Sequence, residues 1–406
     1  RHFRFGTRVT AARFDSSSAR WLVSTNGDAP AFAARYLVMA TGCLSESRLP
    51  DIPGLADFSG KVLQTSRWPR EGVDLAGRRV GVIGSGSTGI QCIPQLAASA
   101  SRLTVFQRTP NFSVPARNAP LPEAQRRAVI ARYPEIRQVQ RTCFSSFGIG
   151  DAPPLSALQE DAATREARYR AAWEQGGISF LFTYNDLIID RAANDTAAEF
   201  VRQRIRDTVA DPAVAERLLP RDYPIGTKRL CLDTDYYASY NRPNVELVDL
   251  RATPIERITA AGIRLQGGRE VPLDALVFAT GFDAVTGALL AVDLRGSQGQ
   301  LLADAWRNGP AMYLGLMSAG FPNLFAITGP GSPSVLSNMV VSIEQHVDFI
   351  ARLIAHARGR ASRRIEADPE AERAWMQHVA EVAQGTLYPQ ARSWYMGSNI
   401  PGKPRM

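Results

Sequence analysis

The residues best suited to chemistry form a glycine-rich turn, Gly84-Ser85-Gly86-Ser87-Thr88-Gly89. A strand pattern over 78–83 precedes the turn, and a helical pattern with its apolar residues on one face follows it. In this context the first glycine allows a tight turn, the second lets the backbone approach a pyrophosphate, and the third allows close helix–strand packing. N–H groups at the helix N-terminus then bind the phosphates. We therefore predict a nucleotide site that includes Gln91; the alternative is an ordinary structural turn.

Cations follow the turn in the sequence. The strand pattern Leu103–Gln107 ends at Arg108-Thr109, where an NAD-binding domain places an acidic residue that binds the ribose 2′-hydroxyl. The planar guanidinium of Arg108 suits a 2′-phosphate instead, which favours NADP over a solvated surface arginine. A second basic pair, Lys228-Arg229, adjoins the apolar segment Leu230–Leu232. Such a pair indicates a nearby anion, although two solvated charges fit the pattern equally well.

No nucleophilic triad or metal-ligand cluster accompanies these residues. The four histidines are not clustered, and the four cysteines (Cys43, Cys92, Cys143, Cys231) lack metal or redox spacing. We therefore expect no metal, a reducing cytoplasmic location, and chemistry that comes largely from bound cofactors.

Composition sets the class of protein. A chain of 406 residues, 45% hydrophobic and 21% charged, predicts two or more globular domains. No run of eighteen apolar residues occurs, so no membrane-spanning helix is expected. The net charge of +8 could suggest nucleic-acid binding. No basic run is interleaved with aromatic residues, which favours a solvated face plus a few anion-binding arginines.

An internal repeat indicates two related domains. The segment 36–42 recurs as 275–281, and each copy is an apolar strand pattern that ends in Ala-Thr-Gly. Short strand patterns precede both copies, at 7–14, 20–25, 255–258 and 262–265. The pair predicts an α/β fold with two Rossmann-like dinucleotide-binding domains. A glycine-rich turn opens only the second domain, and Arg1 is not an initiator Met. We therefore expect the native protein to extend upstream.

The middle of the chain is rich in Ala, Arg, Glu and Gln and predicts a helical insertion over 115–223. The predicted helices are 123–131, 193–209, 342–358 and 369–383, the last with Asp368 as N-cap and Pro369 at its first position. The expected domains are 1–45 and 282–406 (first domain, in two parts), 46–114 and 224–281 (second domain, in two parts), and the insertion 115–223.

Together these motifs resemble type I Baeyer–Villiger monooxygenases, most closely the phenylacetone and steroid monooxygenase branch. The likeness extends from Arg1 to Met406 and is dense in three motifs: Phe106-Gln107-Arg108-Thr109-Pro110-Asn111-Phe112, Gly226-Thr227-Lys228-Arg229-Leu230 and Pro401-Gly402-Lys403-Pro404-Arg405. The resemblance implies FAD and NADPH as cofactors, with FAD bound by the first domain and NADP by the second. It implies insertion of one oxygen atom of O2 beside a ketone carbonyl, through a peroxyflavin, to give an ester or lactone.

The fingerprint of that family, Phe-x-Gly-x-x-x-His-x-x-x-Trp-Pro, is present with one departure. The chain supplies Phe58, Gly60, Trp68 and Pro69, but Gln64 stands where the family has His. Glutamine offers a donor and an acceptor but cannot carry a proton charge. The resemblance implies that the fingerprint couples the movements of the two domains, so we expect Gln64 to reduce the coupling of NADPH oxidation to ester formation or to lower the efficiency of oxygenation.

The resemblance also implies site residues. Arg229 would be the active-site cation that stabilises developing negative charge. Arg108, Thr109 and Lys228 would hold the 2′-phosphate. Trp394 would pack against the nicotinamide ribose or the neighbouring substrate space, with a core tryptophan as the alternative. Met339 would lie at the flavin–substrate junction, and Ser334, Val335 and Leu336 would line the substrate pocket. The catalytic Asp and the FAD glycine motif of the family are expected upstream of Arg1.

Other classes of function compete with this one. A flavin monooxygenase that oxidises nitrogen or sulfur would share most of these motifs, and a truncated, non-catalytic NADP-binding protein would share the nucleotide site. We expect a small ketone and O2 as partners, no nucleic acid or membrane, and a monomer or weak homo-oligomer.

Overall fold

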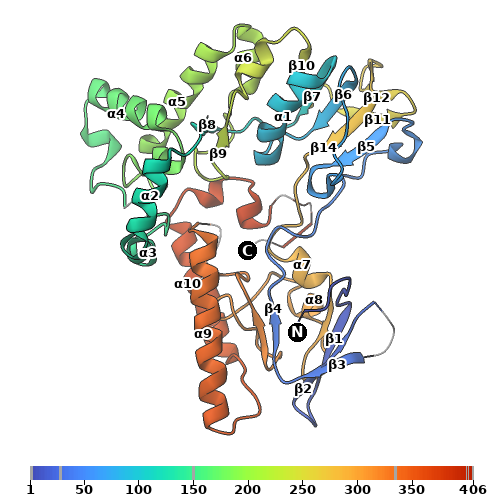
Figure 1. Cartoon of the computed structure of the whole chain (residues 1–406), viewed down its shortest axis with the longest axis vertical. Coiled ribbons are helices and arrows are strands. Elements are labelled where there is room, and N and C mark those ends of the chain that lie inside the picture. Colours follow the sequence, from blue (N-terminus) through green and yellow to red (C-terminus); the bar gives the residue numbers. More distant parts are fainter. Residues whose placement is uncertain are drawn as a thin grey trace. The chain divides into compact units, whose positions relative to one another are not determined.

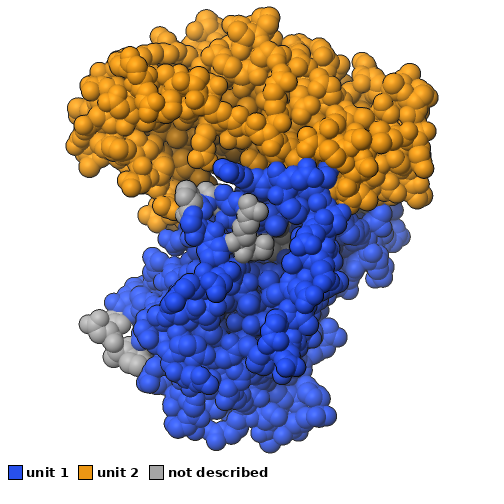
Figure 2. All heavy atoms as spheres, turned by 180° about the vertical axis from the view of Figure 1, so that it is seen from behind, with its two compact units in different colours: residues 1–46, 122–151, 282–406 blue, residues 47–121, 152–281 orange. Residues whose placement is uncertain are grey.

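The computed structural model describes residues 3–26, 30–148, 151–332, 336–398, 400 and 402–404. The chain divides into two compact units, coloured separately in Figure 2: unit 1 comprises 1–46, 122–151 and 282–406, and unit 2 comprises 47–121 and 152–281. The segment predicted as a helical insertion is shared between them, because 122–151 belongs to unit 1. The functional domain boundaries remain a prediction.

Unit 2 is built on a five-stranded parallel sheet with the strand order β10-β7-β6-β14-β5 (Figure 1). Its strands are β5 (Lys61–Gln64), β6 (Arg79–Ile83), β7 (Arg102–Gln107), β10 (Val245–Asp249) and β14 (Ala275–Phe278). The central strands are almost continuous apolar runs, as expected where both faces of a parallel sheet are covered. Pairing aligns Gln64 with Phe278 and Phe278 with Ile83. The carboxyl ends of β5, β14 and β6 therefore lie at one edge.

Helix α1 (Ser87–Ser99) follows β6 and packs on β6 and β7. The predicted apolar face is confirmed, because Ile90, Ile93 and Ala97 are fully buried. Helix α1 continues through Pro94, which the sequence pattern alone would treat as a break. A buried cluster that includes Phe106, Leu276 and Phe278 forms much of the core of unit 2.

The other strands and α-helices of unit 2 lie outside this sheet. They are β8 (Ser113–Pro115), β9 (Cys231–Asp233), β11 (Ile255–Thr259), β12 (Gly262–Leu265), β13 (Glu270–Pro272), α4 (Ala162–Gln175), α5 (Arg191–Thr208) and α6 (Pro212–Leu218). Strands β8 and β9 pair in parallel, and β11-β12-β13 form an antiparallel meander. Each of the three helices begins after an aspartate, Asp161, Asp190 or Asp211, whose side chain accepts bonds from first-turn N–H groups.

Unit 1 contains two small sheets and two long helices. Its strands are β1 (Ala11–Asp15), β2 (Arg20–Ser24), β3 (Pro30–Ala34), β4 (Leu37–Met39), β15 (Asp293–Arg295) and β16 (Leu324–Ala326). Its helices are α2 (Glu123–Ala131), α3 (Tyr133–Thr142), α7 (Gly287–Leu290), α8 (Leu302–Ala305), α9 (Met339–Gly359) and α10 (Pro369–Gln384). The sheets have the orders β15-β1-β2-β3 and β16-β4. Trp21, Phe321 and Phe325 are among the fully buried side chains of this unit.

The repeat predicted from the sequence is present as two parallel strands. The first copy contains β4, paired in parallel with β16, and the second contains β14, paired in parallel with β5 and β6. The N-cap role of Asp368 is confirmed, since its carboxylate accepts from the N–H groups of Glu370 and Ala371. The strand predicted over 7–14 begins only at Ala11. The parallel sheets and the helices that accompany them confirm the predicted α/β fold class.

Candidate functional site

The glycine-rich turn lies at the carboxyl end of β6 in unit 2. A side chain at Gly84 would bring its Cβ within 2.5 Å of the Ala279 carbonyl oxygen, and one at Gly89 would come within 2.3 Å of the Gly84 carbonyl oxygen. No atom lies within 4 Å of the corresponding position at Gly86. Gly84 and Gly89 thus serve close packing, whereas the backbone at Gly86 faces open space. This arrangement fits a phosphate cradle.

The start of α1 leaves its N–H groups available. Gly86 is the N-cap residue and provides no side-chain cap for the first turn. The turn is fixed by its neighbours: the Ser85 hydroxyl donates to the Thr109 carbonyl at 3.0 Å, and the Asn111 amide donates to the Ser85 carbonyl at 2.6 Å. A rigid helix N-terminus with uncapped N–H groups favours an anion.

The predicted 2′-phosphate cations lie near one another. Burial, followed by the positive charge of Arg108, lowers the pKa of Lys228 below its usual range. Lys228 is half-buried, with its Nζ 4.3 Å from the ring centroid of Tyr223. Arg108 is exposed and forms no ion pair with any described residue. Asp222, which partly offsets these effects, is already paired with Arg251. Two neighbouring cations with so little counter-charge fit a phosphate.

The loop that carries Lys228 and Arg229 is held by buried hydrogen bonds. Asn194 of α5 is fully buried; its amide donates to the Leu187 and Ile225 carbonyls at 2.6 and 2.8 Å and accepts from the Ile225 N–H at 3.0 Å. The buried Tyr223 hydroxyl donates to Asn111 Oδ1 at 2.9 Å. These contacts fix Lys228 and Arg229 in relation to the glycine-rich turn. The sequence pattern did not indicate a role for Asn194 or Tyr223.

Replacement of Asn194 by alanine is expected to lower the free energy of unfolding by about 3–5 kcal/mol, because three buried backbone groups lose their partner. Denaturant unfolding of the purified variant measures this change. Asn118→Ala is the control, since the exposed Asn118 amide bonds only to Thr234. Equal stability of the two variants would contradict the anchoring role of Asn194.

Arg229 is the candidate catalytic residue. It immediately precedes Leu230 and β9, and its side chain is exposed. Its guanidinium has no ion pair or hydrogen bond to another side chain among the described residues. The backbone beside it is fixed, because Cys231 N–H donates to the Phe112 carbonyl at 3.3 Å. An unpaired cation on a fixed backbone is suited to stabilising negative charge that develops on a substrate.

The fingerprint residues flank β5 in unit 2: Phe58 and Gly60 precede the strand, Gln64 ends it, and Trp68 and Pro69 follow it. Phe58 is buried, and Gly60 leaves no room for a side chain because a Cβ there would lie 2.5 Å from the Asp274 carbonyl oxygen. Gln64 is half-buried at the carboxyl end of β5, at the same register as Phe278 and Ile83. The position that departs from the family pattern is thus on the sheet edge that carries the glycine-rich turn.

Unit 1 holds the other predicted residues. Half-buried Trp394 and Met339 pack against a small cluster of Cys43, Ala284 and Val285. Met339 begins α9, whose N-cap Asn338 accepts from the Val340 N–H. Leu336 is 44% exposed, while Ser334 and Val335 lie outside the described residues.

The remaining predicted residues in unit 2 are Thr88 and Gln91, both exposed, Ser87 in the first turn of α1, and Trp68 and Pro69 after β5.

The described cysteines form no disulfide, and two of the thiols are poor nucleophiles. All four thiols are free. Burial raises the pKa of Cys92 to about 11 and that of Cys231 to about 12, so both remain protonated at neutral pH. Within the described ranges, no group of three or more His, Cys, Asp or Glu side chains could hold a metal ion. Nor is any described helix both long and apolar enough to cross a membrane.

Comparison with known proteins places the chain in a class of flavin- and nicotinamide-dependent oxidoreductases. Residues 2–132 match the family described as pyridine nucleotide-disulphide oxidoreductase. A Baeyer–Villiger monooxygenase of Pseudooceanicola batsensis is 41% identical over 99% of this chain and 73% of its own length. A phenazine N-monooxygenase of Lysobacter antibioticus is 40% identical over 98% of this chain and 72% of its own length.

A solved structure agrees with these sequences. An oxidised steroid monooxygenase bound to NADP is 47% identical, with a TM-score of 0.92, over 97% of this chain and 75% of that chain. The chain belongs to the Baeyer–Villiger monooxygenases.

Proposed function

We propose that this chain uses Arg229 as the active-site cation of an FAD- and NADPH-dependent oxidation of ketones to esters or lactones. Membership of the family makes the protein a monooxygenase. The observation that supports the role of Arg229 is its unpaired guanidinium on a loop fixed by Asn194 and Tyr223, next to the proposed nucleotide cations.

NADPH is assigned to unit 2. The uncapped N-terminus of α1 and the open backbone at Gly86 would hold the pyrophosphate. Arg108 and Lys228 would bind the 2′-phosphate, and Thr109 lies directly after Arg108. Burial, and after it the charge of Arg108, lowers the pKa of Lys228, and a bound phosphate would oppose both effects, so binding and protonation of this side chain would reinforce each other.

FAD is assigned to unit 1. The N-terminus of the 21-residue helix α9 at Met339 would favour the electron-rich edge of the flavin ring, because first-turn N–H groups and the helix dipole both stabilise negative charge. When bound and reduced by NADPH, FAD supplies the activation of O2. The chain's own contribution is positional and electrostatic: the Arg229 guanidinium would hydrogen-bond the oxygen that gains negative charge as the ketone carbonyl is attacked.

Gln64→His is expected to increase the fraction of oxidised NADPH that appears as ester. The increase should be larger in slightly acidic solution, where histidine carries a charge that glutamine cannot carry. The measurement compares NADPH consumption with ester yield across pH. Gln95→His, at an exposed position on α1, is the control. An unchanged fraction at every pH would show that glutamine at position 64 does not impair the coupling of NADPH oxidation to ester formation.

The proposed substrates are small ketones with O2 as co-substrate. Oxidation of a nitrogen heterocycle is the second candidate, because one relative at 40% identity is a phenazine N-monooxygenase. The test supplies the purified protein with FAD, NADPH and either linear and cyclic ketones or phenazines. Ester or lactone formation supports the proposal, whereas N-oxides alone would replace it with the second candidate.

The four free thiols support a reducing, cytoplasmic location.

A further inference from the structure

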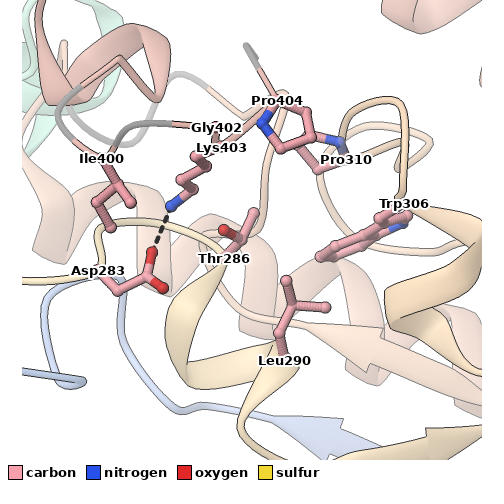
Figure 3. A pocket seen from close by; sticks show the side chains of 9 residues that line it. All are labelled: Asp283, Thr286, Leu290, Trp306, Pro310, Ile400, Gly402, Lys403 and Pro404. Carbon is pink, nitrogen blue, oxygen red and sulfur yellow. Dashed lines mark hydrogen bonds and ion pairs between the residues drawn. The ribbon is translucent and has the colours of Figure 1, made fainter.

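An ion pair outside the proposed catalytic residues joins the C-terminal segment, defined as residues 400–404, to residues 283–284, which follow β14. Lys403 Nζ lies 2.5 Å from Asp283 Oδ1, the ion pair drawn in Figure 3. It also donates to the Ala284 carbonyl at 2.6 Å. The Lys403 side chain is 11% exposed and that of Asp283 is 34% exposed. Many other ion pairs of this chain are more exposed at both partners. A largely buried ammonium with two fixed acceptors is held far more firmly than a surface pair.

The ion pair attaches the segment beside an open hollow. A hollow of about 260 Å³ lies beside Lys403, lined on its other sides by Leu290, Trp306 and Pro310 (Figure 3). The other described residues of 400–404 are Ile400, Gly402 and Pro404, whose side chains cannot hydrogen-bond, so Lys403 makes the polar side-chain contacts of these residues.

The segment that Lys403 contacts has an unfavourable backbone conformation. Val285 has φ = +67°, a region that β-branched residues rarely adopt. Its N–H donates to the Cys43 carbonyl at 2.7 Å, and the Asp283 N–H donates to the Glu46 carbonyl at 2.9 Å. The conformation therefore depends on partners on both sides, with 43–46 on one side and Lys403 on the other.

This same segment supports Trp394. The side chains of Trp394 and Met339 pack against the cluster of Cys43, Ala284 and Val285, and Ala284 is the residue whose carbonyl Lys403 binds. We infer that the Lys403–Asp283 pair is a latch that fixes the surface on which Trp394 rests. The latch would thereby position Trp394 for its proposed contact with the nicotinamide nucleotide. This role rests on the proposed function, and Lys403 and Asp283 act as positioning residues.

The test combines one readout that needs no cofactor with one that does. Tryptic cleavage after the exposed Arg392, two residues before Trp394, reports local opening of the chain around Trp394. Steady-state kinetics separate KM for NADPH from kcat in the FAD-loaded protein. Both are measured for Lys403→Met, Lys403→Arg, Asp283→Asn and the double variant Asp283→Asn/Lys403→Met. Arg295→Met, which removes an exposed ion pair with Asp293, is the control.

Lys403→Met is expected to speed cleavage after Arg392 about tenfold and to raise KM for NADPH more than it lowers kcat. Lys403→Arg should restore both, and the double variant should be no worse than either single variant. Cleavage and KM equal to those of Arg295→Met, or additive effects of the two substitutions, would overturn the latch. Faster cleavage with unchanged KM would overturn its positioning role. If the wild type does not oxidise NADPH, the proposed function fails, and the cleavage data still decide whether Lys403 holds the segment.

Discussion

Replacement of Arg229 by alanine is expected to lower the rate of ester formation by about 10²–10³-fold, the usual cost of removing one fixed donor to a developing anion. NADPH should still be consumed, because its proposed phosphate ligands, Arg108 and Lys228, remain in place. Product analysis by gas chromatography and NADPH absorbance measure the two rates together. Arg229→Lys should retain part of the rate, since an ammonium keeps the charge but not the planar fork of donors.

Stability separates this effect from damage to the fold. Arg229 has no ion pair among the described residues, so its removal leaves no buried carboxylate without a partner. The unfolding midpoint of Arg229→Ala should therefore equal that of the control Arg242→Ala, an exposed arginine of the same unit. Ester formation at the wild-type rate in Arg229→Ala would remove Arg229 from the chemistry.

Replacement of Arg108 by alanine is expected to raise KM for NADPH by about 10–100-fold, since a charge-assisted hydrogen bond contributes roughly 1.5–3 kcal/mol. KM for NADH should change little, because NADH lacks the 2′-phosphate. The double variant Arg108→Ala/Lys228→Ala should lose most of the preference for NADPH. Initial rates with both nucleotides measure this change in specificity.

The control for Arg108 is Arg78→Ala. Arg78 is exposed and precedes β6, at the end of the sheet opposite the glycine-rich turn. Its removal lowers the net charge equally but leaves the proposed phosphate ligands unchanged. An equal loss of NADPH preference in both variants would mean that overall charge, rather than a built site, selects the nucleotide.

The elements that depend on local pattern could be predicted from the sequence. The apolar face of α1 repeats with helical spacing, and Ile90, Ile93 and Ala97 are buried as that spacing predicts. The Ala-Thr-Gly repeat marks two parallel strands because buried parallel strands are short apolar runs. A role for Arg108 in binding the 2′-phosphate could be proposed, because a charged residue at the end of the second strand has a known role in this fold, and this role stays a prediction.

The residues that position the site could not be predicted, because their partners are distant in the sequence. Asn194 lies on a helix where its polarity suggests a solvent-facing residue, yet its amide bonds to Ile225 across 31 positions. Lys403 and Asp283 are 120 positions apart, and no periodic pattern joins residues so far apart. The left-handed Val285 runs against the preference of its own side chain. Tertiary contacts determine the burial of Asn194, the pairing of Lys403 with Asp283 and the backbone conformation of Val285.

The most direct test of the account is the fate of dioxygen in a reaction with a ketone. The purified protein, supplied with FAD, NADPH, a ketone and isotopically labelled O2, is analysed by mass spectrometry of the organic product. The account predicts an ester or lactone that carries one labelled oxygen atom, formed by the wild type and lost in Arg229→Ala. Oxidation of NADPH without a labelled ester, in the presence of a broad set of ketones, would contradict it.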